Sequence, residues 1–227
     1  MKNPNWTIAL LVILYTVGIV GITLPLHPYF YLLTPINLLT SAYLLFSHHN
    51  NWDTKFYVAL GIAFIGGLGA EWLGVHTGMV FGEYHYGDTL GPKVFEVPFM
   101  MGFNWLILIY SSANIARSLF KGETQTTQLG QAAIGASLMT ALDVLIEPIA
   151  VQLDFWQWHQ INGNTLLVAP LQNYLAWWII SFAILSLFLR LVPTSENKVA
   201  PALFMLQFIF FGALIGLSAY LGAFVLN

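Results

Sequence analysis

Residues 131–151 read QAAIGASLMTALDVLIEPIAV, and Asp143 and Glu147 are the two charged residues in this otherwise uncharged run. A helix rises about 1.5 Å per residue, so about 20 mostly apolar residues cross the ~30 Å hydrocarbon core of a bilayer. The run therefore predicts a transmembrane helix that carries two carboxyl groups. Because positions i and i+4 lie on one face of a helix, a single face carries both carboxyls.

Six further runs have the same character, and the composition of the whole chain agrees with them. Of its 227 residues, 58% are hydrophobic and only 7% are charged, whereas a soluble domain has about 25% charged residues. So few charges cannot cover a water-facing surface. We therefore expect a single integral-membrane domain over residues 1–227, an all-α polytopic bundle of about seven transmembrane helices. The other expected spans are 6–26, 29–46, 56–75, 97–116, 169–189 and 199–226.

Lysine and arginine residues are unevenly distributed between the two ends of these spans. With seven spans, the opposite end from the N-terminus holds Lys93 alone. Positive residues accumulate in short cytoplasmic loops. We therefore expect a multi-pass protein of the inner (cytoplasmic) membrane with its N-terminus in the cytoplasm. The residues at the N-terminal end are Lys2, Lys55, Arg117, Lys121, Arg190 and Lys198.

Two loops at the outer end, residues 76–96 and 152–168, are long for simple connectors and rich in aromatic residues. Long loops in compact proteins are usually functional or disordered, and we expect both of these to fold back over the bundle. Tryptophan is also enriched where helices meet the lipid headgroups. On that basis four tryptophans that flank the spans are interpreted as interface anchors: Trp6, Trp52, Trp156 and Trp158.

Acidic residues gather at the same outer end. Glu71 lies near the end of the third span, and Asp143 and Glu147 lie in the outer half of the fifth. An unpaired charge in lipid costs a few kcal/mol or more, so intramembrane acids indicate function. Glu71 alone also fits a capping or snorkelling role. The remaining outer acids are interpreted as solvated loop residues or as residues at the loop edges: Glu83, Asp88, Glu96 and Asp154.

Several carboxyls in one low-dielectric site cannot all be ionised, so at least one should keep its proton. A protonated carboxyl beside a carboxylate is suited to general acid–base catalysis. The candidate catalytic residues are therefore Asp143, Glu147 and Glu71. The candidate substrate-binding residues are aromatic and amide side chains at similar depth: Trp72, Tyr84, Tyr86, Asn104, Trp105, Asn173 and Trp177.

The sequence disfavours several other classes of protein. A net charge of −3 leaves no basic patch for nucleic acid, and the absence of cysteine removes disulfides and thiolate metal sites. The last span lacks the lysine that a retinal Schiff base needs. No glycine-rich phosphate loop is present, and the six histidines form no di-iron pattern. We expect no metal, no cofactor and no nucleic-acid partner.

The two acid-bearing spans begin segments that resemble each other. In residues 71–105 and again in 143–177, an outward span with an acid is followed by an aromatic loop. A proline and an asparagine then open an inward span, and a tryptophan ends each segment. These few matching positions hint at an internal duplication.

The motifs of residues 70–178 together resemble the integral-membrane carotenoid hydratase family of the CruF type, which includes the bisanhydrobacterioruberin hydratases. The resemblance implies a cofactor-independent hydro-lyase that adds water across the terminal C1–C2 double bond of an acyclic carotenoid. The chain has Glu147 where the family pattern has aspartate, and residues 162–165 are degenerate. The motifs are Glu71-Trp-Leu-Gly74, Phe81-Gly82-Glu-Tyr84-His-Tyr86, Asp143-Val-Leu-Ile-Glu147-Pro148, Trp156-Gln-Trp158 and Pro170-Leu-Gln-Asn173.

The resemblance implies a lipophilic carotenoid partner (lycopene, a monocyclic carotene or a C50 precursor), the lipid bilayer, and other carotenoid-pathway enzymes. Either Asp143 or Glu147 would protonate the alkene, and the other acid or Glu71 would orient water. Asn104 and Asn173 are candidates for holding that water. Two alternatives stay open: a proton-coupled transporter of a small solute that uses the acids as a relay, and a non-catalytic carotenoid-binding subunit.

Overall fold

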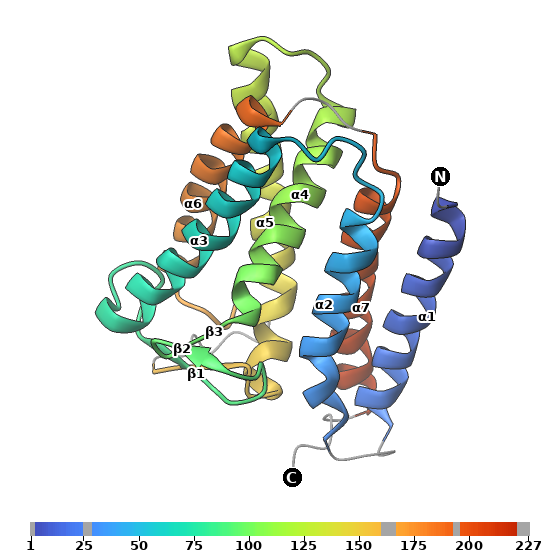
Figure 1. The fold of residues 1–227 in the computed structure, drawn as a ribbon. Helices are drawn as coiled ribbons and strands as arrows, with labels where there is room; N and C mark the ends of the chain where they lie inside the picture. Colours follow the sequence, from blue (N-terminus) through green and yellow to red (C-terminus); the bar gives the residue numbers. More distant parts are fainter. Residues whose placement is uncertain (1–2, 25–28, 160–166, 193–195, 222–227) are drawn as a thin grey trace.

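Seven α-helices make up most of the computed structural model (Figure 1), which describes residues 3–24, 29–159, 167–192 and 196–221. Within those ranges the chain is an all-α bundle, as the sequence predicted. The helices are α1 (Pro4–Thr23), α2 (Thr34–Phe46), α3 (Thr54–Thr77), α4 (Met100–Leu119), α5 (Gln125–Gln152), α6 (Leu171–Leu191) and α7 (Val199–Leu221), and a short 3₁₀ helix, η1 (Phe30–Leu33), precedes α2.

Every expected span overlaps one of these helices, with ends shifted by a few residues. Five of them, α1, α3, α5, α6 and α7, are long and apolar enough to cross a membrane. Helix α2 starts later than expected because Pro35 occupies its first turn, where the missing N–H of proline is tolerated. Helix α4 is long enough to cross a membrane, but the mean hydropathy of its most apolar 18 residues is lower than in these five helices. The number of spans, seven, stays a prediction, as does the orientation of the N-terminus.

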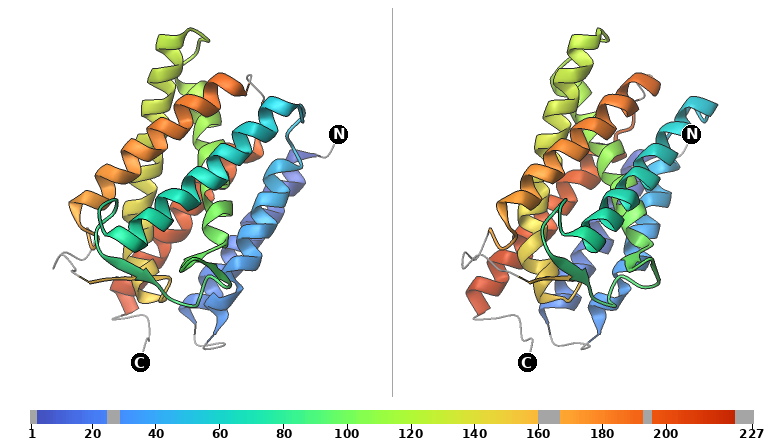
Figure 2. Two further views of the ribbon diagram at one scale, coloured as in Figure 1. Left: turned by 60° about the vertical axis from the view of Figure 1, so that its left-hand side comes forward. Right: turned by 90° about the vertical axis from the view of Figure 1, so that its left-hand side faces the viewer.

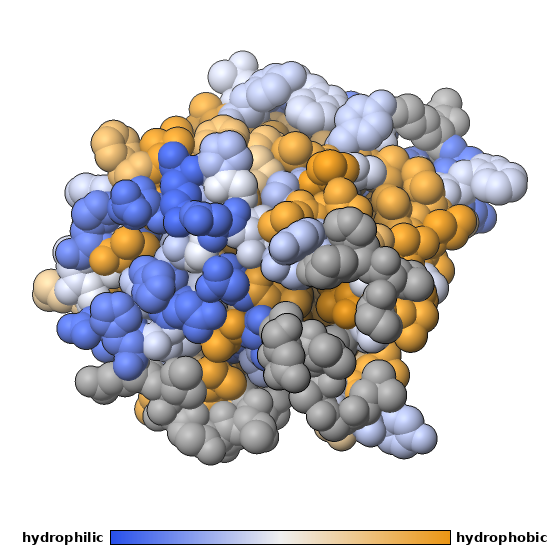
Figure 3. Space-filling view, turned by 90° about the horizontal axis from the view of Figure 1, so that it is seen from below, coloured by the Kyte–Doolittle hydropathy of each residue, from blue (hydrophilic) through white to orange (hydrophobic). Residues whose placement is uncertain are grey.

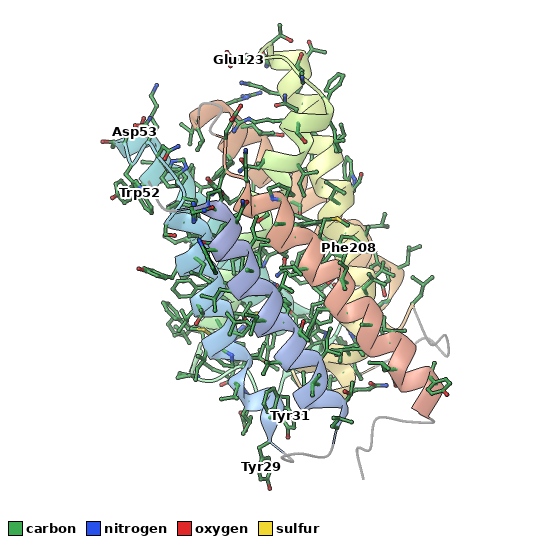
Figure 4. All side chains as sticks on the ribbon, turned by 90° about the vertical axis from the view of Figure 1, so that its right-hand side faces the viewer. Tyr29, Tyr31, Trp52, Asp53, Glu123 and Phe208 are labelled. Carbon is green, nitrogen blue, oxygen red and sulfur yellow. The ribbon has the colours of Figure 1, made fainter. Side chains whose placement is uncertain are left out.

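Some positions used in the sequence argument lie outside the described residues. These are Lys2, the outer ends of the first and last expected spans, and residues 162–165. The two ends of the bundle are nevertheless well marked by residues that are described. Trp52, Asp53 and Glu123 lie at one end, whereas Tyr29 and Tyr31 lie at the other (Figure 4).

Large apolar side chains cover the outside of the helices. Ile65 on α3 is 71% exposed, Ile179 on α6 61% and Ile13 on α1 59%. By contrast, α4 is the central helix, and its buried residues occupy most of its length. Two further views (Figure 2) show α3 and α6 side by side on one face of the bundle, with α1 on the opposite face.

Two small antiparallel sheets cover the end of the bundle opposite the N-terminus (Figure 1). Strand β1 (Tyr84–Tyr86) pairs with β4 (Trp156–Trp158), and β2 (Lys93–Val94) pairs with β3 (Val97–Pro98). We call these sheets and the loops around them the cap. Seen from this end, hydrophilic residues gather over one half of the surface, on the left of Figure 3. The described parts of the two long loops, residues 76–96 and 152–159, therefore fold back over the helices, as the sequence predicted.

Helices α3 to α6 form two helical hairpins whose parts correspond. Positions in the first hairpin correspond, by a constant step, to positions 72 residues later in the second. The acids at 71 and 143, the first strand residues at 84 and 156, the prolines at 98 and 170 and the tryptophans at 105 and 177 are related in this way. His85 and Gln157 are equivalent under this step and pair with each other at the centre of the β1–β4 ladder. Trp105 and Trp177 are also equivalent, and their rings stack 4.6 Å apart at 7°. These pairings are those expected of two hairpins related by a two-fold axis.

Candidate active site

Glu71 is buried on α3 and accepts three hydrogen bonds. The hydroxyls of Tyr84 and Tyr86 each donate to its Oε2 atom over 2.7 Å, and the indole N–H of Trp105 donates to Oε1 over 3.1 Å. Only 3% of the glutamate surface is exposed. Hydrogen bonds from neutral donors stabilise a carboxylate that has lost its contact with water. The three donors therefore offset part of the cost of placing a charge on the buried Glu71.

The local sequence brings the two tyrosines to Glu71. Side chains alternate across a strand, so Tyr84 and Tyr86 turn inward while His85 turns outward. Helix α3 ends at Gly78, whose φ of 63° is left-handed, a conformation that glycine adopts without strain. A Cβ on Gly74 would lie 2.6 Å from the ring of Phe81 and 2.9 Å from the Tyr84 hydroxyl. A glycine is therefore needed where the loop returns to the helix.

Burial raises the pKa of both tyrosines well above its ordinary value, and the neighbouring Glu71 raises it further. Tyr84 and Tyr86 therefore keep their protons at physiological pH and remain donors. Lys93 is the cation nearest to this strand in the sequence, and it contacts the outside of the cap. Its ammonium group lies 2.9 Å from the exposed carboxylate of Asp88 and donates to the carbonyl of Tyr86 over 2.8 Å.

Glu147 on α5, like Glu71, accepts hydrogen bonds from aromatic side chains of the cap. The indole N–H groups of Trp156 and Trp158 donate to its Oε2 atom over 3.1 and 2.7 Å. The side-chain amide of Asn173 reaches its Oε1 atom over 3.3 Å. Because β1 and β4 pair, the two tyrosines and the two tryptophans project from one face of a single sheet. The cap therefore holds acids from two different helices.

Asp143 is the least satisfied of the three acids. Its Oδ2 atom accepts a hydrogen bond from the Asn173 amide over 2.8 Å, whereas its Oδ1 atom is buried without a partner among the described residues. The same amide nitrogen therefore bridges Asp143 and Glu147, each of which is 1% exposed. Pro148 follows directly, and α5 continues through it to Gln152, although a proline removes one helical N–H donor.

A small cavity lies among these groups. Its volume is about 20 Å³, and its walls include Glu71, Glu147, Asn173 and Trp177. A cavity needs roughly 10–15 Å³ and two to four polar partners to hold a water molecule. The cavity therefore has room for one water between two carboxyl groups. Among the described residues, no group of three histidine, aspartate or glutamate side chains is placed to hold a metal ion.

The structure brings together most of the side chains that the sequence singled out. Two of the candidate substrate-binding residues lie elsewhere. Trp72 is 44% exposed, and its ring contacts His76 on the outside of α3. Asn104 lines a different cavity, between α4 and α2. The candidates that contact one another or line the small cavity are Glu71, Tyr84, Tyr86, Trp105, Asp143, Glu147, Asn173 and Trp177.

Trp156 and Trp158 were interpreted as interface anchors, and this was wrong. Both are buried and donate to Glu147. Their alternating pattern, with one residue between them, repeats that of Tyr84 and Tyr86 at the 72-residue step from position 84 to position 156. This repetition is the signal in the sequence that identifies them as part of the site.

Comparisons with known proteins agree with the motifs. The family model described as "Carotenoid biosynthesis protein" matches residues 26–226. A bisanhydrobacterioruberin hydratase of Haloarcula japonica is 29% identical over 128 residues, which is 55% of this chain and 42% of that protein. The matched region is thus less than half of the relative's length. No solved structure gives a significant match.

Proposed function

Because the chain belongs to the carotenoid biosynthesis protein family, we propose that it hydrates the terminal C1–C2 double bond of an acyclic carotenoid end group. The similarity to a protein named as a hydratase supports this choice of reaction. The observation that carries the proposal is the bridge from Asn173 to Asp143 and Glu147, beside a cavity with room for one water. Hydration of an alkene needs a proton and a water molecule, and it needs no redox step.

The first step is protonation of the alkene. We assign the proton to the Asp143–Glu147 pair, because two bridged and buried carboxyls cannot both carry a charge at low cost. Glu147 faces the small cavity and would deliver the proton to C2 of the terminal double bond. The π electrons form the new C2–H bond, and C1 becomes a tertiary carbocation. The pair is then fully ionised.

The second step stabilises that cation. We assign a negative charge to Glu71 in this step, because its three donors are placed to stabilise the carboxylate form. The stacked rings of Trp105 and Trp177 add aromatic surface beside it. An aromatic face stabilises a nearby cation by ~0.5–2 kcal/mol, more when water is excluded. Glu71 therefore acts as an electrostatic stabiliser in this mechanism.

The third step adds water. The molecule in the small cavity attacks C1, its oxygen forms the new C–O bond, and one of its protons returns to the ionised Asp143–Glu147 pair. The product is a tertiary alcohol, and the acids regain their starting protonation state. The net change is the addition of one water.

We also propose that all seven helices cross the inner membrane, with the cap at its outer face. Lys55, Arg117 and Arg190 lie at the end opposite the cap, and such residues favour the cytoplasmic side. The polyene of lycopene, a monocyclic carotene or a C50 precursor would then extend among the helices or in lipid. Other enzymes of the pathway are proposed partners. The acids cluster at one end of the bundle. This gives little support to a transporter, because two gates would need polar groups at both ends.

The test is expression in a lycopene-producing bacterium, followed by mass spectrometry of the extracted pigments. We expect a product heavier by one water, whose oxygen carries label when cells grow in oxygen-18 water. Glu147→Gln should abolish the product, and Glu123→Gln, at an exposed loop acid, should leave it unchanged. If lycopene, monocyclic and C50 precursors are all recovered unaltered, the hydratase proposal fails and a carotenoid-binding subunit takes its place.

A further inference from the structure

A second cavity lies next to the acid cluster. Its volume is about 70 Å³, and it is enclosed by α1, α2 and α7 on one side and by α4 and α5 on the other. The walls are mostly apolar, with Ile146, Leu38 and Phe210 among them. The small cavity beside Glu147 has room for water alone, so of these two cavities the larger one fits a hydrocarbon group.

Two side chains separate the cavities. Met101 and Trp156 line both of them. The indole of Trp156 is fixed by its hydrogen bond to Glu147, whereas methionine is unbranched and has three rotatable bonds. Movement of the Met101 side chain would join the cavities without disturbing the hydrogen bonds of the acids.

The larger cavity lies on one flank of the two-fold related hairpins. Helices α2 and α7 pack against the α4–α5 side, and α1 packs against α7 on the face opposite α3 and α6 (Figure 2). Met101 occupies the position equivalent to Asn173, four residues before the stacked tryptophan in each hairpin. An apolar side chain therefore replaces the bridging amide on the flank where the cavity lies.

One polar group in this cavity lacks a partner. The Oε1 atom of Gln207 on α7 is buried and accepts no hydrogen bond among the described residues, and the residue is 3% exposed. Tyr15, Asn37 and Asn104 line the same space. Buried acceptors are almost always paired in folded proteins. An unpaired acceptor that faces a cavity is suited to an occupant that donates a hydrogen bond, such as a hydroxyl group.

We propose that this cavity binds the carotenoid end group, that Met101 is its passage to the acids, and that Gln207 accepts a hydrogen bond from a hydroxyl group there. The inference rests on the proposed function and names the substrate pocket that the function needs. Two sources supply such a hydroxyl: a bound water, or the tertiary alcohol formed when the end group is hydrated.

Binding measurements test the passage and the pocket without relying on turnover. Purified protein in lipid nanodiscs is titrated with lycopene and with hydroxylated lycopene, and the visible absorbance shift gives each dissociation constant. Leu38→Phe should fill the cavity and weaken binding of both at least tenfold. Met101→Trp should abolish hydration while binding persists, and Met101→Leu should retain both. Thermal unfolding verifies that each variant is folded.

Gln207→Leu distinguishes the two sources of the hydroxyl. Weaker binding of hydroxylated lycopene alone identifies the alcohol, whereas slower hydration with unchanged binding identifies water. Unchanged binding and hydration in this variant overturn the assignment of Gln207. Unchanged binding of lycopene in folded Leu38→Phe overturns the pocket, and normal hydration by Met101→Trp overturns the passage. If the wild type binds lycopene but never hydrates it, the proposed reaction fails while the pocket stands.

Discussion

Tyr84 and Trp158 lie directly opposite each other in the β1–β4 ladder, yet they donate to different carboxylates, Glu71 and Glu147. One pair of strands thus sets the separation of two acids that come from helices α3 and α5. A shift of register by one residue would turn the two donors of the shifted strand away from the acids. The geometry of the candidate site therefore depends on this short ladder.

Trp158→Phe should lower the hydration rate roughly 10- to 100-fold, because a hydrogen bond to a charged group is worth about 1.5–3 kcal/mol. The substitution keeps an aromatic ring in place and removes the N–H that lies 2.7 Å from Glu147. Product formation per folded protein is the measurement. Trp6→Phe, at a site 77% exposed, is the control and should have no effect. Equal rates for the two variants would contradict the role of Trp158.

Asn173→Leu should reduce hydration at least 100-fold and lower the melting temperature. The change has a similar side-chain volume but removes the only donor to Asp143 among the described residues. Gln172→Met is a matched control on the same turn of α6, because Gln172 contacts only loop carbonyls such as that of Met79. Pigment analysis gives the rate, and a thermal unfolding curve gives the stability. Full activity in Asn173→Leu would show that the acids need no bridge.

Gly67→Ala should destabilise the protein by about 1–3 kcal/mol, the usual cost of overpacking a core. A Cβ at this position would collide with the indole of Trp105, which is held between Glu71 and Trp177. Gly69→Ala adds the same methyl group to the same helix where no atom lies within 4 Å. It should leave the stability unchanged or raise it slightly. Thermal unfolding of the two variants provides the comparison, and similar melting temperatures would refute the collision.

Stability should also depend on pH through His49, in the loop between α2 and α3. Its Nε2 atom donates to the carbonyl of Asn51 over 2.8 Å, so Nδ1 accepts from the hydroxyl of Tyr110 over 2.9 Å. This pattern needs a neutral ring, and burial lowers the pKa of His49 below its ordinary value of 6.5. The unfolded chain therefore binds a proton more readily than the folded one. The stabilisation is complete above about pH 6.5 and is lost as the pH falls below it.

Melting temperatures at pH 8 and pH 5.5 measure this effect. The wild type should lose more stability between the two values than His49→Asn does. His76, which is exposed on α3, provides His76→Asn as a control with the wild-type response. A His49→Asn variant with the full wild-type loss would assign the pH dependence to other groups.

Hydropathy predicted the helices because lipid imposes a length and a composition on each span. It also gave the depth of the acids, since depth follows from position along the helix. It did not give the direction that each side chain faces. Neighbouring helical residues are about 100° apart, so Trp72 and Asn104 sit next to Glu71 and Trp105 in sequence but face elsewhere.

The tryptophans of β4 show a different reason why part of the site was missed. Whether Trp156 lies at the lipid interface or in the site depends on pairing with a strand that is 72 residues earlier (position 84 against 156). No local pattern reports such a pairing. The unpaired Oε1 atom of Gln207 is likewise invisible in sequence, because only the packed structure shows which polar groups have partners.

The two-fold relation between the hairpins also bears on how this protein arose. A single hairpin that paired with its own copy would place identical acids at the positions of Glu71 and Asp143, on either side of one axis. When the two copies are joined in one chain, their sequences can differ, and each half can take a different role in the site. Asn173 bridges two acids in one half, while Met101 borders an apolar space in the other. An origin by duplication of one hairpin therefore predicts that the two halves divide these roles between them.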